Sequence, residues 1–227
     1  RKHMGSSDIN PVILSKTDED SACERLSDLP TAGIQLSFIV REFFEECGGK
    51  EALQNLTTAE VCERFIKPAT QHLNSSYCEL LKLKMHPAYR ETAQVFISHA
   101  HQCEFLTVVD ALEWHLRDER DSAAIWFDIF SINQHQPMDW SFEWLCHMFK
   151  SSIQEFGHTI MVMSPWNDPV PFTRAWCIFE VYCTDIAENK FEIAMGERDR
   201  QQFLEDMIAD PKSNFNQMLV KIQAEKS

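Results

Sequence analysis

Short apolar runs alternate with longer stretches of helical periodicity from residue 92 onward. The runs are rich in Val, Ile, Phe and Trp, which is typical of strands that are buried on both faces. The strands expected from these runs cover residues 94–98, 124–128, 159–164 and 191–194. Strands that alternate with helices form a parallel sheet with helices on both faces. The sequence therefore predicts an α/β fold with a parallel sheet of four to five strands.

Ahead of this pattern, the apolar residues follow helical spacing alone. The helices expected from this spacing cover residues 34–47, 57–68 and 76–84. Gly48-Gly49 favours the end of the first helix, because glycine adopts the backbone conformation that closes a helix. Thr57 and Glu60 form a capping box at the start of the second helix, and Pro68 is expected near its end.

The change of pattern divides the chain into three segments. Residues 1–31 are predicted to be a flexible tail, in which His3-Met4 resembles a cloning scar left by a vector. Residues 33–90 are predicted to form a small α-helical unit without a catalytic pattern. Residues 92–227 are predicted to form the α/β domain.

Composition excludes several classes of function. The chain has 35 acidic and 21 basic residues, a net charge of −14, which disfavours nucleic-acid backbones and anionic membrane surfaces as partners. Its longest apolar runs have about five residues, whereas a membrane-spanning helix needs about 20. The 8 cysteines are spread singly, as expected of reduced thiols rather than a disulfide scaffold. We therefore expect a cytoplasmic protein that binds neither nucleic acid nor membrane.

The carboxyl ends of the predicted strands are the expected location of a ligand site, as in other parallel sheets. This places residues 98–102, 128–134 and 164–167 around one crevice. Trp176 and Glu180 follow at a spacing that puts both on one face of a helix. Two interpretations remain open. An aromatic wall beside a carboxylate suits a nucleoside or nicotinamide ring, whereas helical spacing alone also suits a core Trp and a surface Glu.

Four motifs in this order resemble elements of the Toll/interleukin-receptor (TIR) domain. Val95–His99 resembles its opening strand, Trp126–Asp128 its second strand and Ile160–Pro165 its third. Trp176–Glu180 resembles the W-C-x-x-E element on the following helix. The set covers roughly residues 92–196 and is most similar to a divergent TIR-like group from protists, algae and similar eukaryotes. The resemblance implies a flavodoxin-like sheet, which is either shortened or completed by the N-terminal unit.

The resemblance also implies an activity. Many TIR domains are NAD⁺ glycohydrolases in signalling or innate immunity, and the glutamate of the W-C-x-x-E element, here Glu180, is their catalytic residue. A carboxylate stabilises the oxocarbenium-like state that forms when the nicotinamide–ribose bond breaks. NAD⁺ would be the substrate rather than a cofactor, and the products would be nicotinamide with ADP-ribose or cyclic ADP-ribose. The expected substrate-binding residues are Ser98, His99, Asp128, Phe130, Ser131, Ser164, Trp166 and Trp176.

Two other functions stay open. Residues 129–139 correspond to the mobile loop that mediates TIR–TIR contacts and gates the site, so the chain is also expected to self-associate, with other TIR or repeat-domain proteins as further partners. It would then be either an enzyme or an interaction module without turnover. A domain that senses NAD⁺ or its products without cleaving them is the third alternative.

Two local features also have competing interpretations. His99-Ala100-His101-Gln102-Cys103 contains residue types that zinc prefers. No second pair such as C-x-x-C accompanies it, so the sequence predicts a polar loop and no metal site. Trp166 is either part of a lid over the substrate or the packed centre of a rigid, proline-bounded turn.

Overall fold

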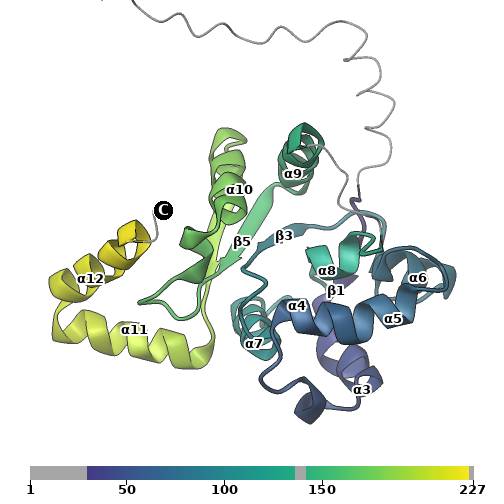
Figure 1. The fold of residues 1–227 in the computed structure, drawn as a ribbon, viewed down its shortest axis with the longest axis horizontal. Helices are drawn as coiled ribbons and strands as arrows, with labels where there is room; N and C mark the ends of the chain where they lie inside the picture. Colours follow the sequence, from purple (N-terminus) through teal and green to yellow (C-terminus); the bar gives the residue numbers. More distant parts are fainter. Residues whose placement is uncertain (1–29, 136–141, 225–227) are drawn as a thin grey trace, which may run out of the picture.

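The computed structural model describes residues 30–135 and 142–224, which contain a six-stranded sheet (Figure 1). Its strand order is β2-β1-β4-β3-β5-β6. The strands are β1 (Gly33–Gln35), β2 (Tyr89–Arg90), β3 (Val95–Ser98), β4 (Ala124–Trp126), β5 (His158–Val162) and β6 (Lys190–Ala194).

Four neighbouring strands form the parallel part of the sheet. β3 lies between β4 and β5, and β6 follows β5, with parallel pairing at each step. β3, the first of these four strands in the chain, therefore lies in the interior of the sheet. β4 is on one side of it, and β5 and β6 are on the other. The α/β class is confirmed, and this order is consistent with the predicted flavodoxin-like fold.

The sheet has six strands rather than the predicted four to five, because the N-terminal region contributes two. β1 pairs antiparallel with β4, through Ile34 and Ile125, and β2 pairs antiparallel with β1. The region predicted as purely helical therefore begins and ends with short strands. The N-terminal unit therefore extends the sheet at the β4 edge, whereas β6 remains the single strand after Glu180, at the opposite edge.

Helices before the parallel strands follow the predicted positions closely. They are α2 (Leu36–Phe38), η2 (Ile39–Phe43), α3 (Phe44–Glu46), η3 (Lys50–Leu53), α4 (Thr58–Val61), η4 (Cys62–Ile66), α5 (Lys67–Thr70) and α6 (Tyr77–Leu83). The capping box between Thr57 and Glu60 is present at the start of α4. Gly48 and Gly49 both have positive φ after the first helix, as their role in ending it requires.

The second helix ends at Thr70, near Pro68 as predicted. The π-helical turn η4 precedes Pro68, and α5 continues to Thr70. A π-helical turn already interrupts the regular pattern of α-helical hydrogen bonds, so the missing N–H of proline is tolerated there.

Helices after β3 cover the two faces of the sheet and extend beyond it. They are α7 (Phe105–His115), α8 (Asp128–Ser131), α9 (Phe142–Phe156), η5 (Val170–Thr173), α10 (Ala175–Ile186), α11 (Glu197–Ala209) and α12 (Pro211–Ala224). α11 and α12 form a hairpin on the opposite side of the molecule from the N-terminal helices (Figure 1). Among the described residues, no helix combines the length and the apolar character needed to cross a membrane.

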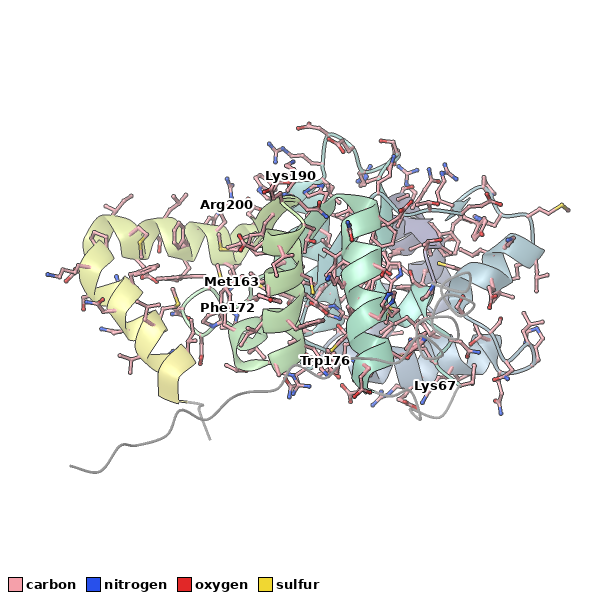
Figure 2. All side chains as sticks on the ribbon, turned by 90° about the horizontal axis from the view of Figure 1, so that it is seen from above. Lys67, Met163, Phe172, Trp176, Lys190 and Arg200 are labelled. Atoms are coloured by element: carbon pink, nitrogen blue, oxygen red, sulfur yellow. The ribbon has the colours of Figure 1, made fainter. Side chains whose placement is uncertain are left out.

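Successive side chains of β3 point to opposite faces of the sheet and so pack in two different hydrophobic clusters. Val95 and Ile97 belong to the cluster that includes α7 and the N-terminal helices. Phe96 belongs to the cluster under α9 and α10, where it stacks on Trp126 at 4.7 Å between ring centroids. Since successive side chains of a strand point to opposite faces, Ser98 shares the α9–α10 side with Phe96. Figure 2 shows these two helices side by side.

Candidate functional site

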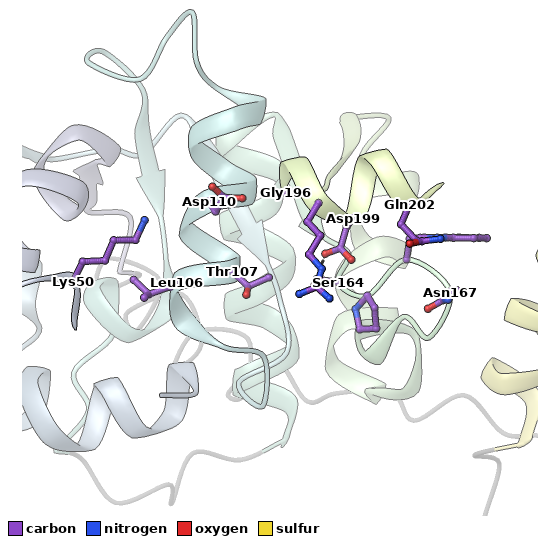
Figure 3. Close-up of a pocket in the computed structure, with 12 residues that line it drawn as sticks. Lys50, Leu106, Thr107, Asp110, Ser164, Asn167, Gly196, Asp199 and Gln202 are labelled. Carbon is purple, nitrogen blue, oxygen red and sulfur yellow. Dashed lines mark hydrogen bonds between the residues drawn. The ribbon is translucent and has the colours of Figure 1, made fainter. Parts of the chain in front are cut away.

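A pocket of about 530 Å³ lies beyond the carboxyl ends of β5 and β6 (Figure 3). Residues that line it include Thr107, Asp110, Ser164, Asn167, Arg198 and Asp199. The hydroxyl of Ser164 donates a hydrogen bond to the carboxylate of Asp199 on α11. Of the residues predicted to bind substrate, Ser164 and Trp166 line this pocket, whereas Glu180 does not.

Trp166 is buried beside this pocket under α11. Its indole Nε1 donates to Asp206 Oδ2 at 3.1 Å, and its ring packs edge-on against Phe203. Only 2% of its surface is exposed. These contacts agree with the packed turn rather than with a lid, because both polar and apolar parts of the side chain are already occupied.

A buried hydrogen bond joins the end of the central strand to α10. Ser98 is the last residue of β3, and its Oγ donates to Oε2 of Glu180 at 2.5 Å. Ser98 is fully buried and Glu180 is 7% exposed. The structure therefore brings together two of the predicted site residues, which are 82 positions apart in the chain.

The Glu180 carboxyl has unusual acid–base properties. Burial raises its pKa to about 8, and the negative charge of Asp128 acts in the same direction. The hydrogen bond from Ser98 and the nearby His101 partly oppose this shift by favouring the ionised form. At neutral pH the carboxyl is therefore largely protonated, and a positively charged group beside it would favour its ionisation.

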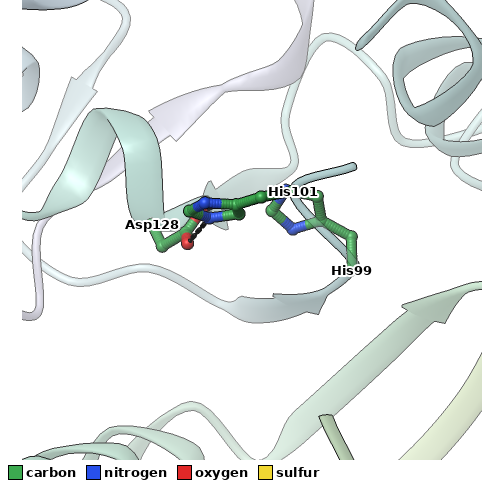
Figure 4. A group of neighbouring side chains, drawn as sticks. All are labelled: His99, His101 and Asp128. Atoms are coloured by element: carbon green, nitrogen blue, oxygen red, sulfur yellow. Dashed lines mark hydrogen bonds and ion pairs between the residues drawn. The ribbon is translucent and has the colours of Figure 1, made fainter. Parts of the chain in front are cut away.

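Three more polar side chains converge on one another (Figure 4), and the charges of Asp128 and His101 act on Glu180. Asp128 begins α8, immediately after β4, and its Oδ2 is hydrogen-bonded to Nε2 of His101. His99 Nε2 lies 4.0 Å from Asp128 Oδ1. The side chain of His99 is 2% exposed and that of His101 is 45% exposed. The group is therefore buried at His99 and reaches solvent at His101.

The protonation of these three side chains depends on their burial and on their mutual interactions. Asp128 raises the pKa of the His101 ring, which favours its protonation, while burial lowers the pKa of His99 to about 4 and keeps it neutral. Burial alone would raise the pKa of Asp128, but the two histidines outweigh it and hold that pKa at about 2. The site therefore combines a His101–Asp128 hydrogen bond, in which protonation of His101 is favoured, with a neutral His99.

Two predicted substrate-binding residues lie in the core. The Phe130 ring is fully buried against Phe43 and Tyr77, with ring centroids 4.9 and 5.5 Å away. The hydroxyl of Ser131, also buried, accepts a hydrogen bond from the backbone N–H of Phe127. In this conformation neither side chain is open to a substrate.

The predicted loop 129–139 begins as the last three residues of helix α8. Its residues 136–139 lie outside the described part of the chain.

Trp176 lies at the start of α10 and packs toward α9. Its ring centroid is 5.5 Å from that of Phe149 and 6.2 Å from that of Phe179. Figure 2 shows the residue beside the start of α10, on the α9 side. Trp176 is only partly buried, whereas Glu180 is buried, so the predicted alternative of a core Trp with a surface Glu does not describe this helix.

No protein-family model, curated protein or solved structure matches this chain.

His101 was placed at the crevice by the sequence analysis but was not among the predicted substrate-binding residues. His99 was predicted as a contact, yet His101 bonds directly to Asp128. The spacing of two residues at the end of a strand was the available signal, because side chains two apart start on the same face.

Proposed function

We propose that this protein is an NAD⁺ glycohydrolase of the TIR-like type, with Glu180 as its catalytic carboxylate. One observation carries the proposal: the buried carboxyl of Glu180 is hydrogen-bonded to Ser98 at the carboxyl end of the central strand. Parallel sheets of this order bind ligands at that edge. The motif resemblance independently assigns the catalytic role to the same glutamate.

The chemistry requires a negative charge near the ribose carbon that holds nicotinamide. The bond between C1′ and the nicotinamide nitrogen breaks, and its electron pair leaves with the neutral nicotinamide. The ionised Glu180 stabilises the oxocarbenium-like ribose that remains. Water then adds through its oxygen to C1′ and releases a proton, which gives ADP-ribose. The cyclic product forms when a nitrogen of the substrate's own adenine attacks instead.

The raised pKa of Glu180 suits a cationic substrate. In the free protein the carboxyl is mostly protonated at pH 7, because its pKa is about 8. The positively charged nicotinamide ring of NAD⁺ favours the carboxylate form when it binds nearby. Substrate binding would thus generate the charge that the reaction needs.

Nicotinamide release is the direct test. The full chain at high concentration is incubated with NAD⁺, and products are separated by chromatography. Glu180→Gln keeps the shape of the side chain and is expected to reduce release by about 100-fold or more, as loss of a transition-state contact typically does. Asp185→Asn, at an exposed position of the same helix, is the matched control and is expected to retain full release. Equal release by wild type and Glu180→Gln would exclude Glu180 as the catalytic residue.

The pH dependence of kcat/KM gives a second test, in which the direction of the shift is predicted. Activity is expected to rise with pH as Glu180 of the free enzyme ionises. Ser98→Ala removes a hydrogen bond that lowers the pKa of Glu180, so the rising limb should move to higher pH. A rising limb that stays in place in Ser98→Ala would contradict the assignment of the limb to Glu180.

An interaction module without turnover is the second candidate, and a surface feature favours it. Ile178, Tyr182 and Ile186 lie four residues apart on α10 and are each at least half exposed. Such an apolar stripe suits contact with a second copy of the chain. Self-association without nicotinamide release, even at high protein concentration, would favour this candidate. Thermal stabilisation by NAD⁺ without release would instead indicate a binding domain that senses NAD⁺.

A further inference from the structure

Three metal-binding side chains meet where two neighbouring parallel strands end (Figure 4). His99 and His101 follow β3, and Asp128 follows β4. One ligand atom from each, two imidazole nitrogens and a carboxylate oxygen, lies within 4.8 Å of the other two. Among residues 30–135 and 142–224, this is the only group of three His, Cys, Asp or Glu side chains with that geometry.

The Nε2 atom of His99 provides an independent observation. It is buried and has no hydrogen-bond partner within the described part of the chain. The ring is fixed edge-on against Phe127, with centroids 4.8 Å apart, and its Nε2 lies 4.0 Å from Asp128. An unpaired buried nitrogen is costly, so its presence in a polar cluster points to a missing partner.

We propose that His99, His101 and Asp128 bind a divalent transition-metal ion, for which Zn²⁺ is the best fit. Imidazole nitrogen and carboxylate oxygen are ligands that zinc prefers, at about 2.0–2.2 Å from the metal. Tetrahedral geometry at those bond lengths separates ligand atoms by about 3.3 Å. The 4.0 Å between His99 Nε2 and Asp128 Oδ1 thus needs a movement of less than about 1 Å.

The sequence alone did not predict this site because its third ligand, Asp128, is distant from the two histidines in the chain. The histidines lacked a second ligand motif nearby in the chain, and the third ligand comes from the next strand, 27 positions after His101. Three protein ligands leave one tetrahedral position for water or for an anionic oxygen of a ligand. The inference does not rest on NAD⁺ cleavage, because metal binding is measured without NAD⁺.

A second histidine–carboxylate group in the protein serves as a comparison. His115 and His158 both contact Glu192, at 3.3 and 2.7 Å. Its carboxylate already pairs with Lys190 at 2.8 Å, and a fixed ammonium disfavours a metal cation at the same oxygen. His158→Gln is therefore the matched control for substitutions at the proposed site.

The experiment is a zinc titration of the full chain after removal of metals by a chelator. Calorimetry is expected to give one Zn²⁺ per chain, and Co²⁺ in its place is expected to give the visible absorption bands of a tetrahedral N/O site. His101→Ala and Asp128→Asn are each expected to weaken binding by more than about 100-fold, since even loss of an outer partner of a ligand costs about 10–100-fold. Because the His101 side chain is 45% exposed, His101→Ala is expected to fold normally, which circular dichroism verifies.

Two controls separate this site from other zinc-binding groups. His158→Gln is expected to bind zinc as wild type does. Cys146→Ala is expected to do the same, because the partly buried Cys146 thiol lies outside the proposed ligand set. Absence of stoichiometric binding by wild type, unchanged binding by His101→Ala, or loss of binding in Cys146→Ala would each overturn the proposal.

Discussion

A chain shortened to residues 92–227 is expected not to fold, although all four parallel strands lie within it. The largest hydrophobic cluster includes residues from both sides of residue 91. Phe43 shows this directly, since its ring packs against Phe105 at 6.0 Å and against Phe130 at 4.9 Å between centroids. β1 also covers the edge of β4 through the pair Ile34–Ile125.

The burial lost on this truncation is as large as the total stability of a typical domain. Ile34, Leu36, Phe38 and Phe43 are each at most 2% exposed in the full chain. Burial of one such side chain contributes about 1.5–3 kcal/mol, whereas a domain is stable by about 5–15 kcal/mol in total. Removing this set, and exposing its partners around β4, therefore cancels most or all of the stability.

Circular dichroism and urea unfolding measure the outcome. The shortened chain is expected to lack a cooperative unfolding transition. A chain that begins at residue 30 keeps every contact described above and is the matched control, with a transition like that of the full chain. A cooperative transition in residues 92–227 alone would show that the α/β part is stable without the N-terminal helices.

Sequence patterns predicted the parallel part of the fold because each strand is bounded by helices with clear periodicity. β1 and β2 could not be found in this way, since strands of three and two residues are too short to show alternation. Their formation depends on pairing with β4, which is a tertiary contact.

The sequence predicted which strand ends and which helix form the candidate site, but not which side chains of these segments point into it. The rule that ligands bind at strand ends, together with helical spacing, selected Ser98, Asp128 and Glu180, which the structure brings near one another. The same rule also selected Phe130, which packs against Phe43 and Tyr77, and Ser131, which bonds to the backbone of Phe127. A residue in a turn after a strand is oriented by packing with distant segments, here Phe43 and Tyr77, and one-dimensional periodicity does not report that orientation.

Glu180→Gln is expected to stabilise the protein increasingly as the pH rises from about 5 to 8. In the unfolded chain this carboxyl loses its proton near its ordinary pKa of 4.5, whereas burial raises the pKa in the folded protein to about 8. Between these values the folded state holds the extra proton, so wild-type stability falls as pH rises, by about 1.4 kcal/mol per pH unit from this group. Glutamine has no proton to lose and still accepts the hydrogen bond from Ser98.

Urea unfolding of both proteins at pH 5, 6.5 and 8 measures this difference. The free energies of unfolding are expected to be similar at pH 5, and Glu180→Gln should exceed wild type by on the order of 3 kcal/mol at pH 8. Asp185→Asn, at an exposed carboxylate of the same helix, should show no such pH dependence. A difference between Glu180→Gln and wild type that stays constant with pH would mean that Glu180 titrates normally in solution. An increasing difference would mean that the fold keeps a destabilising carboxyl at this position, as expected of a group retained for catalysis rather than for stability.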